Sequence, residues 1–216
     1  MEKLVSEISI KSGHVRALLR RLNKSYFEHH ILLEIENSLN RNQITNKEWL
    51  VDLLSQYSEM ITYHPNILVL AGWYGLAGHM IANKIPCQVT VIDKNPDCAI
   101  IGKELYPYLK HVTADLNDFN MSGYNIIICT ACEHITDDEI NTVLDKKDKS
   151  TVVFLQSNNY NEVKDHINCK TSVDDFANSL QLSSCKKYTL SLDKYDRIIF
   201  VRRNGFSITS LLFVKS

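Results

Sequence analysis

The sequence lacks an excess of charge of either sign and has no long apolar run. Its 24 basic and 25 acidic residues give a formal net charge of -1, which supplies no broad attraction to nucleic acid, since that usually needs a clustered basic face. No apolar stretch approaches the roughly 18 residues of a membrane-spanning helix. The opening Met1-Glu2-Lys3 begins an amphipathic stretch and not a secretory leader. These absences favour a cytoplasmic protein that binds neither nucleic acid nor a membrane.

Proline-rich linkers, low-complexity tracts and internal repeats are also absent from the sequence. The 6 cysteines do not have the spacing of a small disulfide-bonded secreted domain, so we expect reduced thiols, most of them buried. With 44% hydrophobic and 23% charged residues, the composition is that of a globular protein with a real core. The length of 216 residues leaves room for one domain and a modest appendage.

The sequence does contain an aliphatic run that leads into glycines, at residues 67–81. The run fits a strand buried on both faces, Gly72 and Gly75 permit a tight turn, and the apolar spacing that follows is helical. The start of a helix leaves N–H groups unpaired, and glycine lets a ligand approach the backbone. The pattern therefore predicts a strand, a turn and a helix that suit a nucleotide-like ligand.

Residues 3–62 show helical periodicity without a strand-like stretch, which predicts three or four helices. We expect breaks at 12–13, 23–25 and 40–42, with Thr45-Asn46-Lys47-Glu48 as a cap before the last helix. Residues 1–64 would then form a helical cap that closes over a substrate.

The residues of this cap that we expect near a substrate are Phe27, His30 and Ile31. A packing surface, or a homodimer interface formed by the N-terminal helices, is the alternative interpretation of the same segment.

Residues 65–206 alternate between strand-like and helix-like segments. The expected strands are 67–71, 88–92, 110–113, 125–130, 151–156, 186–192 and 197–203. The expected helices are 76–84, 96–106, 136–145, 161–166 and 172–180. Such alternation predicts an α/β fold with an open, Rossmann-like sheet of seven strands, mostly parallel, whose ligands lie at the carboxyl ends of the strands. The last two strands have a short polar link and should form an antiparallel hairpin, and the tail at 207–216 is not placed.

Acidic residues follow the second and third expected strands. Asp93 comes at the tip of the second strand, where its two carboxylate oxygens can accept both hydroxyls of a ribose. A helix cap is the alternative role for Asp93, but Asn95 before Pro96 fits that role better. After the third strand, Asp115 offers an acceptor for an exocyclic amine, and Leu116 offers an apolar contact for a ring face.

With these residues the chain resembles the class I S-adenosylmethionine (SAM) methyltransferase superfamily over roughly residues 65–203. The resemblance implies SAM as the cofactor, with the ribose at Asp93, the adenine amino group at Asp115 with Leu116, and the methionine part over Gly72 to Gly75. Lys94 and Cys132 join the expected cofactor contacts. A nicotinamide-dependent oxidoreductase would require a G-x-G-x-x-G turn and gives Asp115 no role.

The glycine turn departs from the pattern of the family it resembles. The usual motif reads acid-x-G-x-G-x-G, whereas this chain has Val69 in place of the acid, which commonly helps to hold the cofactor's ammonium group. Trp73 and Tyr74 also stand where the turn is normally bare. Either ring could face the sulfonium, a cation–π contact of about 0.5–2 kcal/mol. The alternative is that both rings pack under the helical cap.

Polar clusters follow the fourth and fifth expected strands. Glu133 and His134 are candidate acid/base groups, and Asn158 and Tyr160 could orient a substrate by hydrogen bonds. The two clusters, Cys132-Glu133-His134 and Gln156 to Tyr160, resemble motifs of a branch of small bacterial and phage SAM-dependent enzymes. They differ from the Asn/Asp-Pro-Pro-Tyr/Phe signature of enzymes that methylate amino groups of nucleic acids.

A zinc site is a disfavoured alternative for the same region. Cys132, His134, His166 and Cys169 could nominally supply two thiolates and two imidazoles. Cys169 has no partner at C-x-x-C spacing, however, and methyl transfer from a sulfonium needs no metal. We therefore predict no metal, and a nucleophilic role for Cys132 is weaker still because the sequence assigns it no base.

Three functions remain open at this point. The first is in-line methyl transfer from SAM to a small molecule, driven mainly by proximity and orientation. The second is attack within SAM itself, for example to form azetidine-2-carboxylate and methylthioadenosine, which fits the missing acid at Val69. The third is SAM binding without catalysis, against which the polar groups at the strand ends argue.

Overall fold

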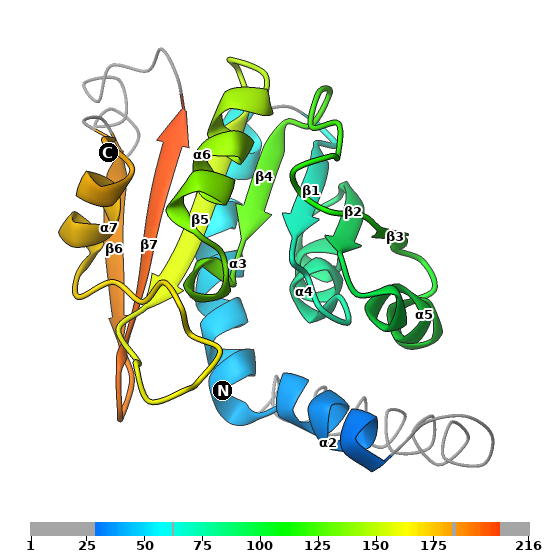
Figure 1. Ribbon diagram of the computed structural model, residues 1–216. Coiled ribbons are helices and arrows are strands. Elements are labelled where there is room, and N and C mark those ends of the chain that lie inside the picture. The colour runs from blue at the N-terminus through cyan, green and yellow to red at the C-terminus, as the bar shows by residue number, and fades with distance from the viewer. Residues whose placement is uncertain (1–28, 62, 183–184, 204–216) are drawn as a thin grey trace.

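The computed structural model describes residues 29–61, 63–182 and 185–203 (Figure 1). Seven strands form one sheet in the order β3-β2-β1-β4-β5-β7-β6. Their bounds are β1 (Asn66–Leu70), β2 (Gln88–Asp93), β3 (Lys110–Thr113), β4 (Ile126–Cys129), β5 (Val152–Asn158), β6 (Lys186–Ser191) and β7 (Asp196–Arg203). The first five strands run parallel, and β7 is antiparallel to both β5 and β6. The predicted seven-stranded sheet with its antiparallel hairpin is confirmed.

The apolar runs of the sequence form the central strands. All residues of β4 and β5 are buried, as are the last four of β1, because helices cover both faces of the sheet. Strand β5 extends two residues beyond the predicted end, and there Asn158 pairs in register with Arg197 of β7. The extension places both polar side chains at the carboxyl edge of the sheet.

The helices form a layer on each face of the sheet. They are α2 (His29–Ser38), α3 (Arg41–Ile61), α4 (Leu76–Lys84), α5 (Pro96–Leu105), the short 3-10 helix η1 (Cys132–His134), α6 (Asp137–Lys146) and α7 (Val173–Ser179). Ile67 and Val69 of β1 pack with residues of α3 and α4. Leu68 and Leu70 pack with residues of α6 and α7 on the opposite face, and Figure 1 shows α6 and α3 on the two sides of the sheet.

Of the two described N-terminal helices, α3 packs on a face of the sheet and α2 lies at its edge. Helix α3 packs on the sheet through Leu50 and Leu54, which are fully buried. Helix α2 lies beyond the carboxyl ends of the parallel strands (Figure 1), where Ile35 packs with Tyr74. The predicted break near residue 40 is confirmed, while the breaks at 12–13 and 23–25 and the residue Phe27 lie outside the described residues, and so do the side chains of His30 and Ile31.

Two local predictions are wrong. Helix α3 begins at Arg41, so residues 45–48 lie inside it and do not cap it. The side chain of Asn40 caps it instead, by accepting a hydrogen bond of 3.0 Å from the backbone N–H of Gln43. The expected helix at 161–166 is also absent, and turns occupy residues 161–165.

The segment 159–172 is held by hydrogen bonds to distant residues. The side-chain amide of Asn168 donates to the backbone oxygen of Ile135 (2.7 Å) and to Asp137 (2.9 Å). The backbone N–H of Asn168 donates to the backbone oxygen of Glu133 (2.9 Å). These bonds fix the segment beside η1, at the carboxyl edge of the sheet. Across the described parts of the chain, no helix combines the length and the apolar character needed to cross a membrane.

Candidate functional site

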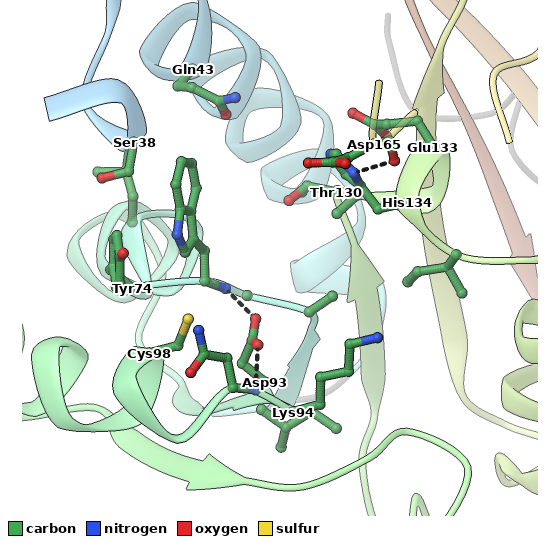
Figure 2. Close-up of a pocket in the computed structure, with 18 of the residues that line it drawn as sticks. Ser38, Gln43, Tyr74, Asp93, Lys94, Cys98, Thr130, Glu133, His134 and Asp165 are labelled. Atoms are coloured by element: carbon green, nitrogen blue, oxygen red, sulfur yellow. Dashed lines mark hydrogen bonds between the residues drawn. The ribbon is translucent and has the colours of Figure 1, made fainter. Parts of the chain in front are cut away.

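A cavity of about 620 Å³ opens at the carboxyl edge of the sheet, within the size range of small-molecule sites. Its walls come from α2, α3, the glycine turn, the ends of β2, β3 and β4, and the segment 159–172. Figure 2 shows Tyr74 and Cys98 at one side of the cavity and Glu133 and His134 at the other. The residues that line it include Glu34, Gln43, Lys47, Gly72, Trp73, Tyr74, Asp93, Lys94, Asp115, Leu116, Glu133, His134, Asp165 and Arg197.

The glycine turn has the strained backbone that a close approach to a ligand requires. Ala71 and Trp73 have φ values of 44° and 51°, in the left-handed region that side chains rarely adopt. Such conformations cost about 1–3 kcal/mol each and concentrate at functional sites. A Cβ atom on Gly72 would overlap the side chain of Val91, so the turn lies tight against β2.

Asp93 is anchored by the backbone on both sides. Its Oδ2 accepts a hydrogen bond of 3.0 Å from the N–H of Trp73, and its Oδ1 accepts one of 3.0 Å from the N–H of Asn95 (Figure 2). Each carboxylate oxygen can accept a further hydrogen bond. The carboxylate is therefore held in one orientation and can accept two hydroxyl groups from a ligand in the cavity.

The other expected cofactor residues meet the same cavity in part. Lys94, Asp115 and Leu116 line it, and Asp115 is exposed, with its Oδ1 accepting from the N–H of Asn117 (2.8 Å). The cavity wall formed by described residues does not include Gly75. Cys132 is also outside that wall, because its fully buried Sγ faces the backbone oxygen of Cys129.

The two aromatic residues of the turn both line the cavity and pack under α2. Their rings stack with centroids 5.2 Å apart, and Tyr74 is buried against Ile35. The hydroxyl of Tyr74 donates a hydrogen bond of 3.0 Å to Glu34 of α2. Burial and this hydrogen bond raise the pKa of Tyr74. Val69, at the position of the family's acid, lies fully buried in the core.

A buried polar network forms the opposite wall. Oε1 of Glu133 accepts hydrogen bonds of 2.7 Å from both Asn158 and Arg197. In the amide orientation that satisfies both of its neighbours, Asn46 accepts from Nε and Nη2 of Arg197 (3.2 and 3.3 Å) and donates to Oε1 of Gln156 (3.1 Å). The network joins α3, η1, β5 and β7, and it holds the Glu133 carboxylate in place.

Lys47 of α3 adds an amine to the same wall. It is 8% exposed, and its Nζ donates a hydrogen bond of 2.5 Å to Gln43. Burial and the nearby charge of Arg197 lower the pKa of Lys47 to about 7, against the opposing effect of Glu133. At neutral pH a large fraction of this amine is uncharged, so it can accept a proton as well as donate one.

The remaining candidates lie around the segment 159–172. His134 is exposed, and its Nδ1 is 2.9 Å from the backbone oxygen of Asp165. Asn158 is buried behind Glu133. Tyr160 donates its hydroxyl to Glu162 (2.8 Å), and neither Asn158 nor Tyr160 belongs to the described wall of the cavity.

Sequence reasoning missed Lys47, Arg197, Asn46 and Glu34 as members of the site. The position of Asn46 on its helix was an available signal. Residues four apart share a helix face, and Asn46 lies four residues before the buried Leu50. A polar side chain on the apolar face of a helix requires a partner in the core.

Comparison with solved structures identifies proteins that share this fold. No protein-family model and no curated protein matches the sequence. Among solved structures, the chain is similar to the mitomycin 7-O-methyltransferase MmcR, with a TM-score of 0.60 and 15% identity over 82% of this chain and 58% of that one. The chain has the fold of the class I methyltransferases.

Two further methyltransferases are matched over a larger share of their own length than MmcR. A SAM-dependent methyltransferase from Clostridium acetobutylicum has a TM-score of 0.59 and 12% identity, over 82% of this chain and 99% of that one. The N-methyltransferase NodS from Bradyrhizobium japonicum has a TM-score of 0.58 and 12% identity, over 74% and 97%. At these identities the similarity shows the methyltransferase fold, and the chain spans about six-tenths of the length of MmcR.

Proposed function

We propose that this protein binds SAM and transfers its methyl group to a small molecule. The observation that carries the proposal is Asp93, whose two oxygens are anchored at the end of β2 on the edge of the cavity. The methyltransferase fold supports it. A carboxylate held in this way is suited to a ribose with two free hydroxyls.

The remaining cofactor contacts follow from the residues around Asp93. Asp115 would accept from the adenine amino group, and Leu116 would cover the ring. The methionine part would lie over the strained turn, with the face of Trp73 near the sulfonium. SAM supplies an electrophilic methyl group, so the protein has mainly to bind and orient the reactants.

The small molecule that accepts the methyl group would lie against Glu133 and Lys47, across the cavity from Tyr74. Hydrogen bonds from Arg197 and Asn158 fix Glu133, and the pKa of Lys47 is lowered to about 7. An attacking hydroxyl or amine loses one proton as the methyl group is transferred, and groups that can accept a proton lie on this wall. Helix α2 would cover the reactants and exclude water.

Intramolecular attack on SAM is the second candidate. The observation that favours it is the burial of Val69 in the core, because β1 then offers no acid to hold the ammonium group of SAM. An amino group left uncharged and free could attack its own carbon chain and release methylthioadenosine.

Incubation with SAM alone separates the two candidates. We expect binding by isothermal titration calorimetry and no turnover until an acceptor is added, when S-adenosylhomocysteine appears by mass spectrometry. Methylthioadenosine formed without an acceptor would instead establish the intramolecular reaction. The Asp93→Asn variant serves as the control for both products, and failure of the native protein to bind SAM would overturn both candidates.

A further inference from the structure

Three potential metal ligands converge at one end of the cavity. Glu133 and His134 come from η1 and His166 from the segment 159–172, and one ligand atom from each lies within 4.8 Å of the other two. The rings of His134 and His166 stand almost perpendicular, with centroids 4.7 Å apart. Groups this close, and of these types, match the nitrogen and oxygen ligands of zinc.

Both imidazoles are held in a tautomer that leaves Nε2 free for a metal ion. Nδ1 of His134 lies 2.9 Å from the backbone oxygen of Asp165, and Nδ1 of His166 lies 2.7 Å from that of Tyr160. A carbonyl oxygen can only accept, so the hydrogen in each bond belongs to Nδ1. In the neutral ring, Nε2 then keeps its lone pair. Histidines that bind metals commonly have their second nitrogen fixed by a carbonyl in this way.

The carboxylate of Glu133 has an unused oxygen. Asn158 and Arg197 both donate to Oε1, whereas Oε2 is buried and has no hydrogen-bond partner among the described residues. A buried polar atom without a partner costs about 1–3 kcal/mol. A bound cation would satisfy Oε2, and the two bonds to Oε1 would orient the carboxylate toward it.

We propose that Glu133, His134 and His166 bind one Zn²⁺ ion. Zinc with three protein ligands keeps a fourth position open, and Glu133 and His134 both line the cavity, so the open position would face it. Bonds of about 2.0–2.2 Å require the three ligand atoms to move closer together when the ion binds. The site does not depend on methyl transfer.

This set of ligands differs from the zinc site considered from the sequence, which included Cys132 and Cys169. Cys132 directs its Sγ toward the oxygen of Cys129. Cys169 donates to Oδ1 of Asn158 (3.4 Å) and to the oxygen of Tyr160 (3.2 Å).

Titration of the full chain, freed of metal with a chelator, tests the proposal. Isothermal titration with Zn²⁺ should show one ion per chain, and Co²⁺ should give the visible absorption of a tetrahedral complex. His134→Ala and His166→Ala should each weaken Zn²⁺ binding at least about tenfold, the effect of losing about 1.4 kcal/mol. Glu133→Gln should weaken it as well.

The matched control is His64→Asn, which alters an exposed histidine away from the cavity. Asparagine tolerates the left-handed φ of 58° at this position, so zinc binding should be unchanged. Circular dichroism would verify that every variant is folded. Absence of Zn²⁺ binding to the native protein, or equal binding by the native protein and both histidine variants, would overturn the proposal, and SAM binding would be measured separately.

Discussion

Arg197 of β7 donates a hydrogen bond of 2.7 Å to Glu133 of η1, and the two side chains are 5% and 3% exposed. The residues lie 64 positions apart in the chain, so the ion pair exists only in the folded protein. Its burial distinguishes it from the surface pair of Lys187 and Asp174, whose side chains are 35% and 72% exposed.

Replacement of Arg197 by Met should therefore destabilise the protein. The variant leaves the carboxylate of Glu133 buried without its cation, a loss of about 3–5 kcal/mol in the free energy of unfolding. Urea denaturation measures this loss. The control Lys187→Met breaks the exposed pair and should cost no more than about 1 kcal/mol. Equal effects of the two variants would contradict the assigned burial.

Asp93→Asn should weaken SAM binding. The amide keeps one acceptor oxygen but directs its NH₂ group toward a backbone donor, either Trp73 or Asn95. Loss of one charge-assisted hydrogen bond, about 1.5–3 kcal/mol, corresponds to a roughly 10- to 150-fold higher Kd. Isothermal titration calorimetry measures it, with the exposed Asp145→Asn as control. A Kd unchanged by Asp93→Asn would remove Asp93 from the cofactor site.

Gly102→Ala should destabilise the sheet edge beside the glycine turn. A Cβ atom on Gly102 would lie 2.5 Å from Cε1 of His111, and His111 is buried, so it cannot simply move aside. Overpacking of this kind costs about 1–3 kcal/mol. Thermal unfolding should show a lower Tm than that of Lys103→Ala, an exposed neighbour on the same helix. A Tm equal to the native value would show that His111 can relocate.

Acid should destabilise the protein through His111. Burial and the charge of Lys103 lower the pKa of His111, against the opposing hydrogen bond to the oxygen of Tyr106. Because the unfolded state binds a proton at about pH 6.5 and the folded state only at lower pH, the contribution of His111 to stability is present above pH 6.5 and declines as the pH falls.

Unfolding in urea at several values between pH 5 and pH 8 measures this contribution. The His111→Leu variant should lose less stability over that range than the native protein, since it has no imidazole to protonate at this position. Parallel curves for the two proteins would indicate that the pKa of His111 is the same in the folded and unfolded states.

Local sequence signals predicted most of the fold. The apolar run at 67–70 and the glycines after it gave β1, the turn and α4, because burial and backbone freedom act over short distances. The caps also follow local chemistry. Asn95 before Pro96 caps α5, and Thr136 caps α6 in a capping box with Glu139, as expected for these residue types.

The site could be predicted only in part. Asp93 and Asp115 follow strands, and parallel strands bring their carboxyl ends to one edge, so both were expected near the cavity. Arg197 was missed because its partners Glu133 and Asn46 are distant in the chain, and Lys47 was missed because its burial arises only when α3 packs on the sheet. Nothing beside Arg197 in the sequence indicates that its charge is neutralised by a glutamate that precedes it by 64 residues.

The segment 161–166 shows the same limit for backbone structure. Its composition allows a helix, but residues 161–165 form turns, and nearby Asn168 donates hydrogen bonds to Glu133 of η1 and to Asp137 of α6. The backbone contact of Asn168 with Glu133, 35 positions away, has no local signal.

The hydrogen bond between Asn46 and Gln156 has a consequence for how the cavity opens. It reinforces the apolar packing of Leu50 and Leu54, so α3 is tied to the centre of the sheet and should share its slow amide hydrogen exchange. Helix α2 is held at the edge of the sheet by the hydrogen bond between Tyr74 and Glu34 and by the packing of Ile35, and it should exchange faster. Access to the cavity would then depend on the swing of one short helix about residues 39–40, while the floor beneath it stays rigid.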